Sequence, residues 1–249
     1  MPESSLALSY DDIRRRVGKE RGYRTDIEDW EAQEKEDIEF CLRDGSDWFY
    51  LRANHDWSFL SPLATITLPD GEQEVELPWD FGFPTDECIY FEDMLGRSIR
   101  IVADGVILRK RQDNAGTTGR PMMAAVVTQS KPGIRVGQQS KLIYWPEADD
   151  DYTVQIRYSI IPAALSAATP TPYGGAQHAG TLLECCLAAS ERMDGNPSGP
   201  HGQTAMMMLE SSRILDRKAK AKMMATNQRY PGKGGRFKES NIVTYIPGP

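Results

Sequence analysis

The side chains that most often bind metals or act as nucleophiles are few in this chain, and their spacing suits neither task. The cysteines are Cys41, Cys88, Cys185 and Cys186. No two of them form a C-x-x-C pair, and adjacent cysteines rarely bridge each other or hold one metal ion. The three histidines, His55, His178 and His201, are far apart in the sequence. We therefore expect no metal and no cofactor, and we interpret the cysteines as buried thiols in a reducing compartment.

Three other motifs lack what their chemistry would need. Asp149, Asp150 and Asp151 are adjacent, whereas a calcium loop alternates its ligands, so a solvated turn is the better interpretation. Residues 232–236 are rich in glycine, but no strand pattern precedes them as in a phosphate-binding loop. Ser198 and His201 share a loop without an ordered base and nucleophile. We expect no catalytic residues and a protein that is not an enzyme; a hydrolase using unidentified carboxylates remains the alternative.

Charge is distributed unevenly along the 249 residues, whose net charge is -7. Residues 1–60 hold 15 acidic and 9 basic side chains, a net charge of -6. Residues 213–238 hold 9 basic side chains against one acidic one, a net charge of +8. Basic segments of this kind commonly meet nucleic acid or an acidic protein surface. A solvated helix face followed by a loose tail is the interpretation that needs no partner.

Length and composition favour one large domain or two small ones. The chain is 40% hydrophobic and 26% charged, and no apolar run reaches the roughly 18 residues of a membrane span. The N-terminus has neither the basic nor the apolar region of a signal peptide, which predicts synthesis in a cytosol.

Helical patterns occupy the first 60 residues. Ser9 precedes two carboxylates, as at a helix start, and Gly22 marks a helix end. A second helix is predicted to begin at Asp26. Its apolar stripe comprises Trp30, Ile38, Cys41, Leu42 and Phe49. The aromatic segments 48–51 and 57–60 could stack on a base or a sugar, but we interpret them as core where helices meet a sheet.

Alternation of apolar and polar residues from Pro62 onward predicts strands. Segments 64–68 and 73–77 flank Asp70-Gly71 and predict a hairpin, whereas residues 78–84 predict a rigid loop. Segment 104–112 fits either a short helix or a strand. Further strands are expected at residues 88–91, 99–102, 123–128, 141–145 and 152–158.

Two further helices are predicted at residues 177–194 and 203–223. In the second we assign packing roles to Met207, Leu209, Ile214, Leu215 and Met223. The order of helices, strands and helices predicts an α+β fold. Residues 1–62 and 176–225 would form a helical bundle, and residues 63–175 a β-rich insertion, sandwich- or barrel-like. Residues 226–249 would form an extended C-terminal arm.

Several short segments occur in an order that resembles the head-to-tail adaptor (connector) proteins of tailed bacteriophages, similar to the tail tubular protein A group of short-tailed phages. The segments are WSFL at 57–60 with the hairpin behind it, LPWDFG at 77–82, GRP at 119–121, YTVQIRY at 152–158, and PYGGAQH at 172–178 leading into LLE at 182–184. The resemblance covers most of residues 10–220. Each motif is unspecific alone, and their shared order carries the resemblance.

The resemblance implies a structural virion protein without catalytic residues. Family members form a ring, usually of twelve copies, beneath the portal protein. The ring continues the DNA channel and receives the tail nozzle or tail tube protein. Genomic DNA would pass through without specific binding, and no membrane is involved. The implied location is the head–tail junction, after synthesis in the cytoplasm of the host bacterium.

The basic C-terminal region has no counterpart in the resemblance, so its role is a hypothesis from charge and composition. Its last apolar residues suit strand addition to a partner. We predict that the region docks on the portal, and a nucleic-acid-binding accessory protein that uses this region is the alternative. The predicted docking residues are Arg217, Lys218, Lys220, Lys222, Arg229, Tyr230, Arg236, Phe237, Ile242, Val243 and Tyr245.

Overall fold

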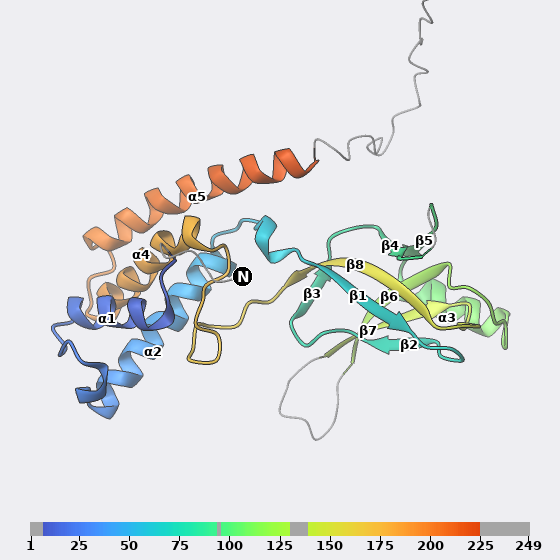
Figure 1. Cartoon of the computed structure of the whole chain (residues 1–249), viewed down its shortest axis with the longest axis horizontal. Helices are drawn as coiled ribbons and strands as arrows, with labels where there is room; N and C mark the ends of the chain where they lie inside the picture. The colour runs from blue at the N-terminus through green and yellow to red at the C-terminus, as the bar shows by residue number, and fades with distance from the viewer. Residues whose placement is uncertain (1–6, 94–95, 130–138, 225–249) are drawn as a thin grey trace, which may run out of the picture.

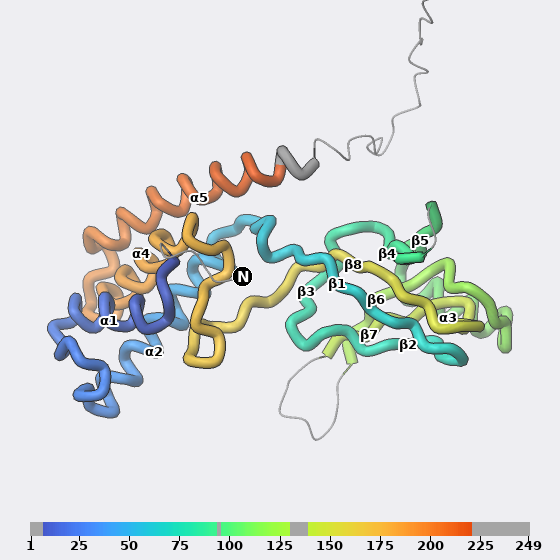
Figure 2. The backbone as a smooth tube through the Cα atoms, in the orientation of Figure 1, coloured from blue at the N-terminus to red at the C-terminus, as the bar shows by residue number. Residues whose placement is uncertain are grey.

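Helices gather at one end of the molecule and a large sheet at the other (Figure 1, Figure 2). The computed structural model describes residues 7–93, 96–129 and 139–224, with side chains described as far as residue 220. The predicted arm, residues 226–249, lies outside this range. The fold is mixed α+β, as the sequence predicts. The helical end contains α1 (Tyr10–Glu20), α2 (Ala32–Asp47), α4 (Ala176–Met193) and α5 (Pro200–Met224).

Local capping signals account for α1. The Ser9 side chain accepts the backbone N–H of Asp12, and the Asp12 carboxylate accepts the backbone N–H of Ser9 at 3.0 Å. This reciprocal pair is a capping box. Gly22 follows the helix with a φ of 77°, a left-handed conformation that favours glycine. Both predicted ends of α1 are confirmed.

The predicted start of the second helix at Asp26 is wrong. A single 3-10 turn, η1 (Ile27–Asp29), comes first, and α2 begins only at Ala32. The backbone of Trp30 between them is extended, and its buried indole donates to the Arg24 carbonyl at 2.6 Å. The packing of this one indole therefore outweighs the helical pattern around it, although the whole predicted apolar stripe is buried.

Helix α4 is the centre of the bundle and packs against both α2 and α5. Its adjacent thiols, Cys185 and Cys186, are free and buried, as predicted. Helices α2 and α4 approach each other closely at Gly45. A Cβ atom at this position would lie 2.6 Å from the Cα atom of Cys186 and 2.7 Å from its backbone nitrogen. The contact therefore requires glycine, because backbone atoms cannot rotate away.

Gly45→Ala is expected to lower the free energy of unfolding by about 2 kcal/mol, because the two helices must separate to admit one methyl group. Gly105→Ala is the matched control. It also lies in a helix, but an added Cβ meets nothing within 4 Å, so alanine should leave stability unchanged or slightly raised. Urea unfolding of both variants measures the difference, and equal stabilities would contradict the close approach.

The strands form one eight-stranded sheet in the order β1-β8-β4-β5-β6-β7-β2, with β3 also paired to β8. The pairs are antiparallel except for β5 and β6, which are parallel. Helix α3 (Asp104–Asp113) lies in the crossover between these two, so segment 104–112 is helical. The strands are β1 (Leu63–Leu68), β2 (Glu74–Glu76), β3 (Phe81–Pro84), β4 (Cys88–Phe91), β5 (Ser98–Ile101), β6 (Met123–Gln129), β7 (Gln139–Trp145) and β8 (Tyr152–Ile160).

The predicted hairpin is wrong in its pairing. The turn at Asp70-Gly71 exists, and Gly71 has a φ of 71°, but β1 pairs with β8 and β2 pairs with β7. The turn thus joins the two edges of a sheet that rolls toward a barrel (Figure 1). The length of β8 favours its pairing with β1, because β1 matches six consecutive residues of β8 and buries Ile66 and Leu68.

Residues 78–84 are not wholly a loop, because β3 occupies their second half and extends β8. Gly82 makes this possible. A Cβ atom there would lie 2.7 Å from the Ser159 carbonyl oxygen, so only glycine lets the two backbones meet. The prolines at both ends of the segment are typical of a loop, and the local sequence does not show that β3 pairs with the distant strand β8.

The predicted packing of α5 is largely wrong. Met207, Ile214 and Leu215 are exposed, and of the predicted members with described side chains only Leu209 is buried. Apart from Leu209, the inward face carries small or polar residues, because α4 and α5 lie close together. Its members are Ala205, Leu209, Ser212 and Asp216.

Candidate functional site

The junction between the helices and the sheet is built on Trp57. Helix α2 continues into a π-helical turn, η2 (Trp48–Arg52), and a short 3-10 helix, η3 (Ser58–Leu60), leads into β1. The Trp57 side chain is 1% exposed, and its indole N–H donates to the Phe49 carbonyl at 3.1 Å. Its ring lies 4.8 Å from Phe49, 5.3 Å from Phe59 and 5.6 Å from His178, measured between centroids. The aromatic rings of segments 48–51 and 57–60 are buried in the core or packed against it, as predicted, whereas Leu51 is exposed.

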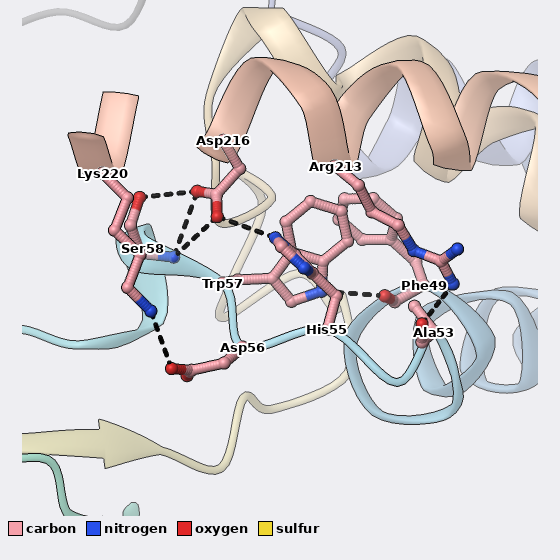
Figure 3. A network of polar contacts seen from close by, with 9 residues as sticks. All are labelled: Phe49, Ala53, His55, Asp56, Trp57, Ser58, Arg213, Asp216 and Lys220. Carbon is pink, nitrogen blue, oxygen red and sulfur yellow. Dashed lines mark hydrogen bonds and ion pairs between the residues drawn. The ribbon is translucent and has the colours of Figure 1, made fainter. Parts of the chain in front are cut away.

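A second contact fixes α5 to this junction through Asp216 (Figure 3). Asp216 is 2% exposed, and its carboxylate accepts the Ser58 N–H at 3.1 Å and the Ser58 hydroxyl at 2.5 Å. His55 Nε2 lies 2.8 Å from the other carboxylate oxygen. One buried acidic side chain therefore holds α5 against the segment that connects helices and sheet. We call Asp216, Ser58 and His55 the junction clamp.

Two basic side chains of α5 flank the junction clamp and contact the same segment. Arg213 donates to the Ala53 carbonyl, and Lys220 Nζ lies 2.9 Å from the Asp56 carboxylate (Figure 3). Part of the C-terminal positive charge thus serves contacts within the chain. Of the predicted docking residues, Arg217 and Lys218 are exposed, and Lys220 is the one paired with Asp56.

The remaining predicted docking residues are not placed. The backbone of Lys222 belongs to α5, but its side chain lies outside the described residues. Seven others also lie outside them, namely Arg229, Tyr230, Arg236, Phe237, Ile242, Val243 and Tyr245. Portal docking by this set therefore stays a prediction.

The junction clamp has the residue types of a hydrolytic triad but not its connections. In a triad the serine hydroxyl gives its proton to a histidine that an acid orients. Here Ser58 and His55 both bind Asp216, so the carboxylate is the hub and takes the hydroxyl hydrogen bond itself. Nearby His178 is buried, and desolvation lowers its pKa despite the opposing charge of Asp216. This geometry suits holding segments together.

Sequence reasoning missed the junction clamp. Asp216 is the single acidic residue among nine basic ones in residues 213–238, and an isolated carboxylate in such a run is a signal of a specific partner. Its partners are 158 and 161 residues away in the sequence. No local pattern connects residues so far apart.

A second polar cluster lies where α4 turns into α5. The Glu191 carboxylate accepts the N–H groups of His201 and Gly202 at 3.2 and 3.0 Å, which satisfies the first turn of α5. His201 Nδ1 lies 2.9 Å from Glu184. Burial by itself lowers the pKa of His201, but the hydrogen bond and charge of Glu184, with the charges of Glu191 and Glu20, raise it overall.

A raised folded pKa means that His201 stabilises the fold when protonated. This contribution is complete below about pH 6.5, the pKa in the unfolded chain, and is lost as the pH rises through the raised folded pKa. His201→Gln should therefore cost up to about 1 kcal/mol near pH 5.5 and much less near pH 9. Urea unfolding of both proteins at the two pH values measures this, and an equal loss at both would contradict it.

Two surfaces of the helical bundle expose large apolar side chains. The first is the outward face of α5, formed by Met206, Met207, Ile214 and Leu215, which we call the α5 face. The second is an open groove of about 390 Å³ between α2 and α4, which we call the α2–α4 groove. It is lined by Phe40, Asp44, Ala189, Arg192 and Met193. Large apolar side chains gathered on an exposed surface are typical of interaction sites.

Two further findings concern the described part of the chain. It contains no group of three His, Cys, Asp or Glu side chains placed to hold a metal ion. Among its helices, none is both long and apolar enough to cross a membrane.

The fold and the junction define a two-part α+β protein, in which the junction clamp joins a helical bundle to a rolled sheet. The chain belongs to the SU10 adaptor protein family, whose model matches residues 8–232. A comparison with curated proteins gives no match. Family membership makes the chain a structural adaptor of a bacteriophage virion, a class that works through portal and tail proteins. This confirms the resemblance to phage adaptors, whereas the similarity to the tail tubular protein A group stays a prediction.

Proposed function

We propose that this chain forms a ring between the portal and the tail, continues the DNA channel and provides the tail attachment site. Membership of the adaptor family over residues 8–232 carries the proposal. The junction clamp supports it, because a connector between two large structures needs a fixed geometry between its two parts. The proposed ring has about twelve copies, a number that the sequence resemblance to phage adaptors implies, and each copy contributes two different surfaces.

The division of labour within the chain is part of the proposal. Residues 1–62 with 176–225 form the bundle that carries the ring, residues 63–175 the β-rich insertion, and residues 226–249 a docking arm. The location is the head–tail junction, after synthesis in the host cytoplasm. A net charge of -7 suits a channel that lets the genome pass, since tight phosphate binding would slow it.

The nucleic-acid alternative receives no support from the described residues. Arg213 and Lys220, two members of the basic segment, contact the junction within the chain. Purified chain mixed with portal rings of the same phage tests the adaptor proposal by sedimentation. Co-sedimentation that persists when duplex DNA is added in excess supports it. A chain that sediments with DNA but never with the portal would reverse the assignment.

The docking arm makes a separate prediction. Removal of residues 227–249 should leave the fold and its unfolding midpoint unchanged and abolish co-sedimentation with the portal. The reason is that this segment carries four of the basic residues of the +8 stretch, Arg229, Lys233, Arg236 and Lys238, and its apolar end. A full-length variant with these four residues changed to glutamine tests whether their charge, and not the length of the arm, is needed for binding. A truncated chain that still binds the portal with wild-type affinity would refute a docking role for the arm.

A further inference from the structure

We propose that copies of this chain associate head to tail, with the α5 face of one copy packed into the α2–α4 groove of the next. This inference rests on the proposed ring and names the surfaces that would build it. The occupant of each surface is a second copy of the same chain. Three observations lead to it, namely the exposed apolar residues, the placement of the two surfaces in the bundle and the opposite net charges of α2 and α5.

The two surfaces have the apolar content that a buried contact needs. On the α5 face, Met206 and Met207 are 65% and 66% exposed. In the α2–α4 groove, Phe40 is 56% exposed and Met193 41%. Methionines adapt to an irregular partner surface, and aromatic side chains are frequent sources of binding energy in interfaces.

The α5 face and the α2–α4 groove are carried by helices that lie on different sides of α4. Helix α4 packs against both α2 and α5 and separates them, with α5 along the top of the bundle and α2 below (Figure 1, Figure 2). One copy therefore cannot bring its own α5 face to its own groove. Contact between two different surfaces is head to tail, and it closes into a ring when the rotation between copies permits it.

The charges of the two helices are complementary. Helix α2 holds six acidic and two basic residues, a net charge of -4. Helix α5 holds five basic and two acidic residues, a net charge of +3. Arg217 and Lys218 are exposed and follow Ile214 and Leu215 by three residues on the α5 face. In the groove Asp44 already pairs with Arg192 at 2.5 Å, so the attraction comes from the net negative charge of α2, and two α5 faces would repel each other.

Two double variants of the full chain test the assignment. Met207→Gln with Leu215→Gln alters the α5 face, and Phe40→Gln with Met193→Gln alters the groove. Glutamine keeps the helices and adds no charge. Val106→Gln with Leu108→Gln is the matched control, because these residues are exposed on α3 at the sheet end. Native mass measurements follow assembly over a range of concentrations, with and without portal rings.

Each face variant is expected to raise the concentration needed for assembly by about 30-fold or more, and the control to leave it unchanged. An equimolar mixture of the two face variants should form 1:1 dimers and nothing larger, because one intact face remains on each chain. If the wild-type chain assembles and either face variant assembles equally well, the inference is overturned. It is also overturned if the mixture of the two face variants stays monomeric. Neither result would contradict the proposed ring. A wild-type chain that stays monomeric even with portal rings would contradict the ring and the proposed function with it.

Discussion

Asp216→Ala is expected to lower the free energy of unfolding by about 3 kcal/mol, because it removes a buried carboxylate and leaves two half-buried partners without their acceptor. Asp216 is buried and accepts two hydrogen bonds from Ser58 while contacting His55. The loss should appear in urea unfolding. In hydrogen exchange, the end of α5 that carries Asp216 should open before the rest of the bundle, since the junction clamp holds it.

Asp56→Ala provides the control for this prediction. It removes an ion pair in the same region, but the Asp56 and Lys220 side chains are 56% and 35% exposed, and such pairs contribute at most about 1 kcal/mol. If Asp216→Ala lowers the free energy of unfolding by no more than Asp56→Ala does, the junction clamp does not hold α5. Asp216→Asn keeps the shape and removes the charge, so an intermediate loss is expected.

Trp57→Ala should cost about 3–5 kcal/mol, the range for removing a large buried aromatic side chain. The indole is in contact with Phe49, Phe59 and His178, and its N–H donates to a backbone carbonyl in η2. The substitution therefore leaves a cavity and an unpaired carbonyl between the helices and the sheet.

The control for Trp57 is Trp79→Ala, since Trp79 is 72% exposed and its loss should change stability by no more than about 0.5 kcal/mol. Trp57→Phe refines the test because it keeps a ring and loses the hydrogen bond. Chemical denaturation of the three variants gives the ranking. A Trp57→Ala chain as stable as Trp79→Ala would contradict the account of the junction.

The features that could be predicted from the sequence depend on interactions between residues close together in the chain. Ser9 and Asp12 satisfy each other across three residues, so the start of α1 follows from local sequence. Strand β8 alternates buried and half-buried side chains over its length, and this period is visible in the sequence. The α+β class and the core role of the aromatic segments follow from the same signals.

The missed features depend on partners far along the chain. Nothing near β1 shows that it pairs with β8 and not with β2, because the choice depends on the longer ladder that β8 offers. Helix α5 has an apolar pattern, but its inward face is Ala205, Ser212 and Asp216 with Leu209, because close approach to α4 favours small and bonded side chains. The junction clamp joins residues about 160 positions apart.

The mass of the complex that this chain forms with portal rings of its phage tests the adaptor account most directly. Native mass spectrometry of the mixture counts the copies. The account predicts a discrete complex in which one portal ring carries a closed ring of about twelve adaptor copies. When the adaptor is in excess, portal rings that carry fewer copies should be absent. Portal rings that keep their own mass beside a monomeric chain, at concentrations well above those in an assembling virion, would contradict it.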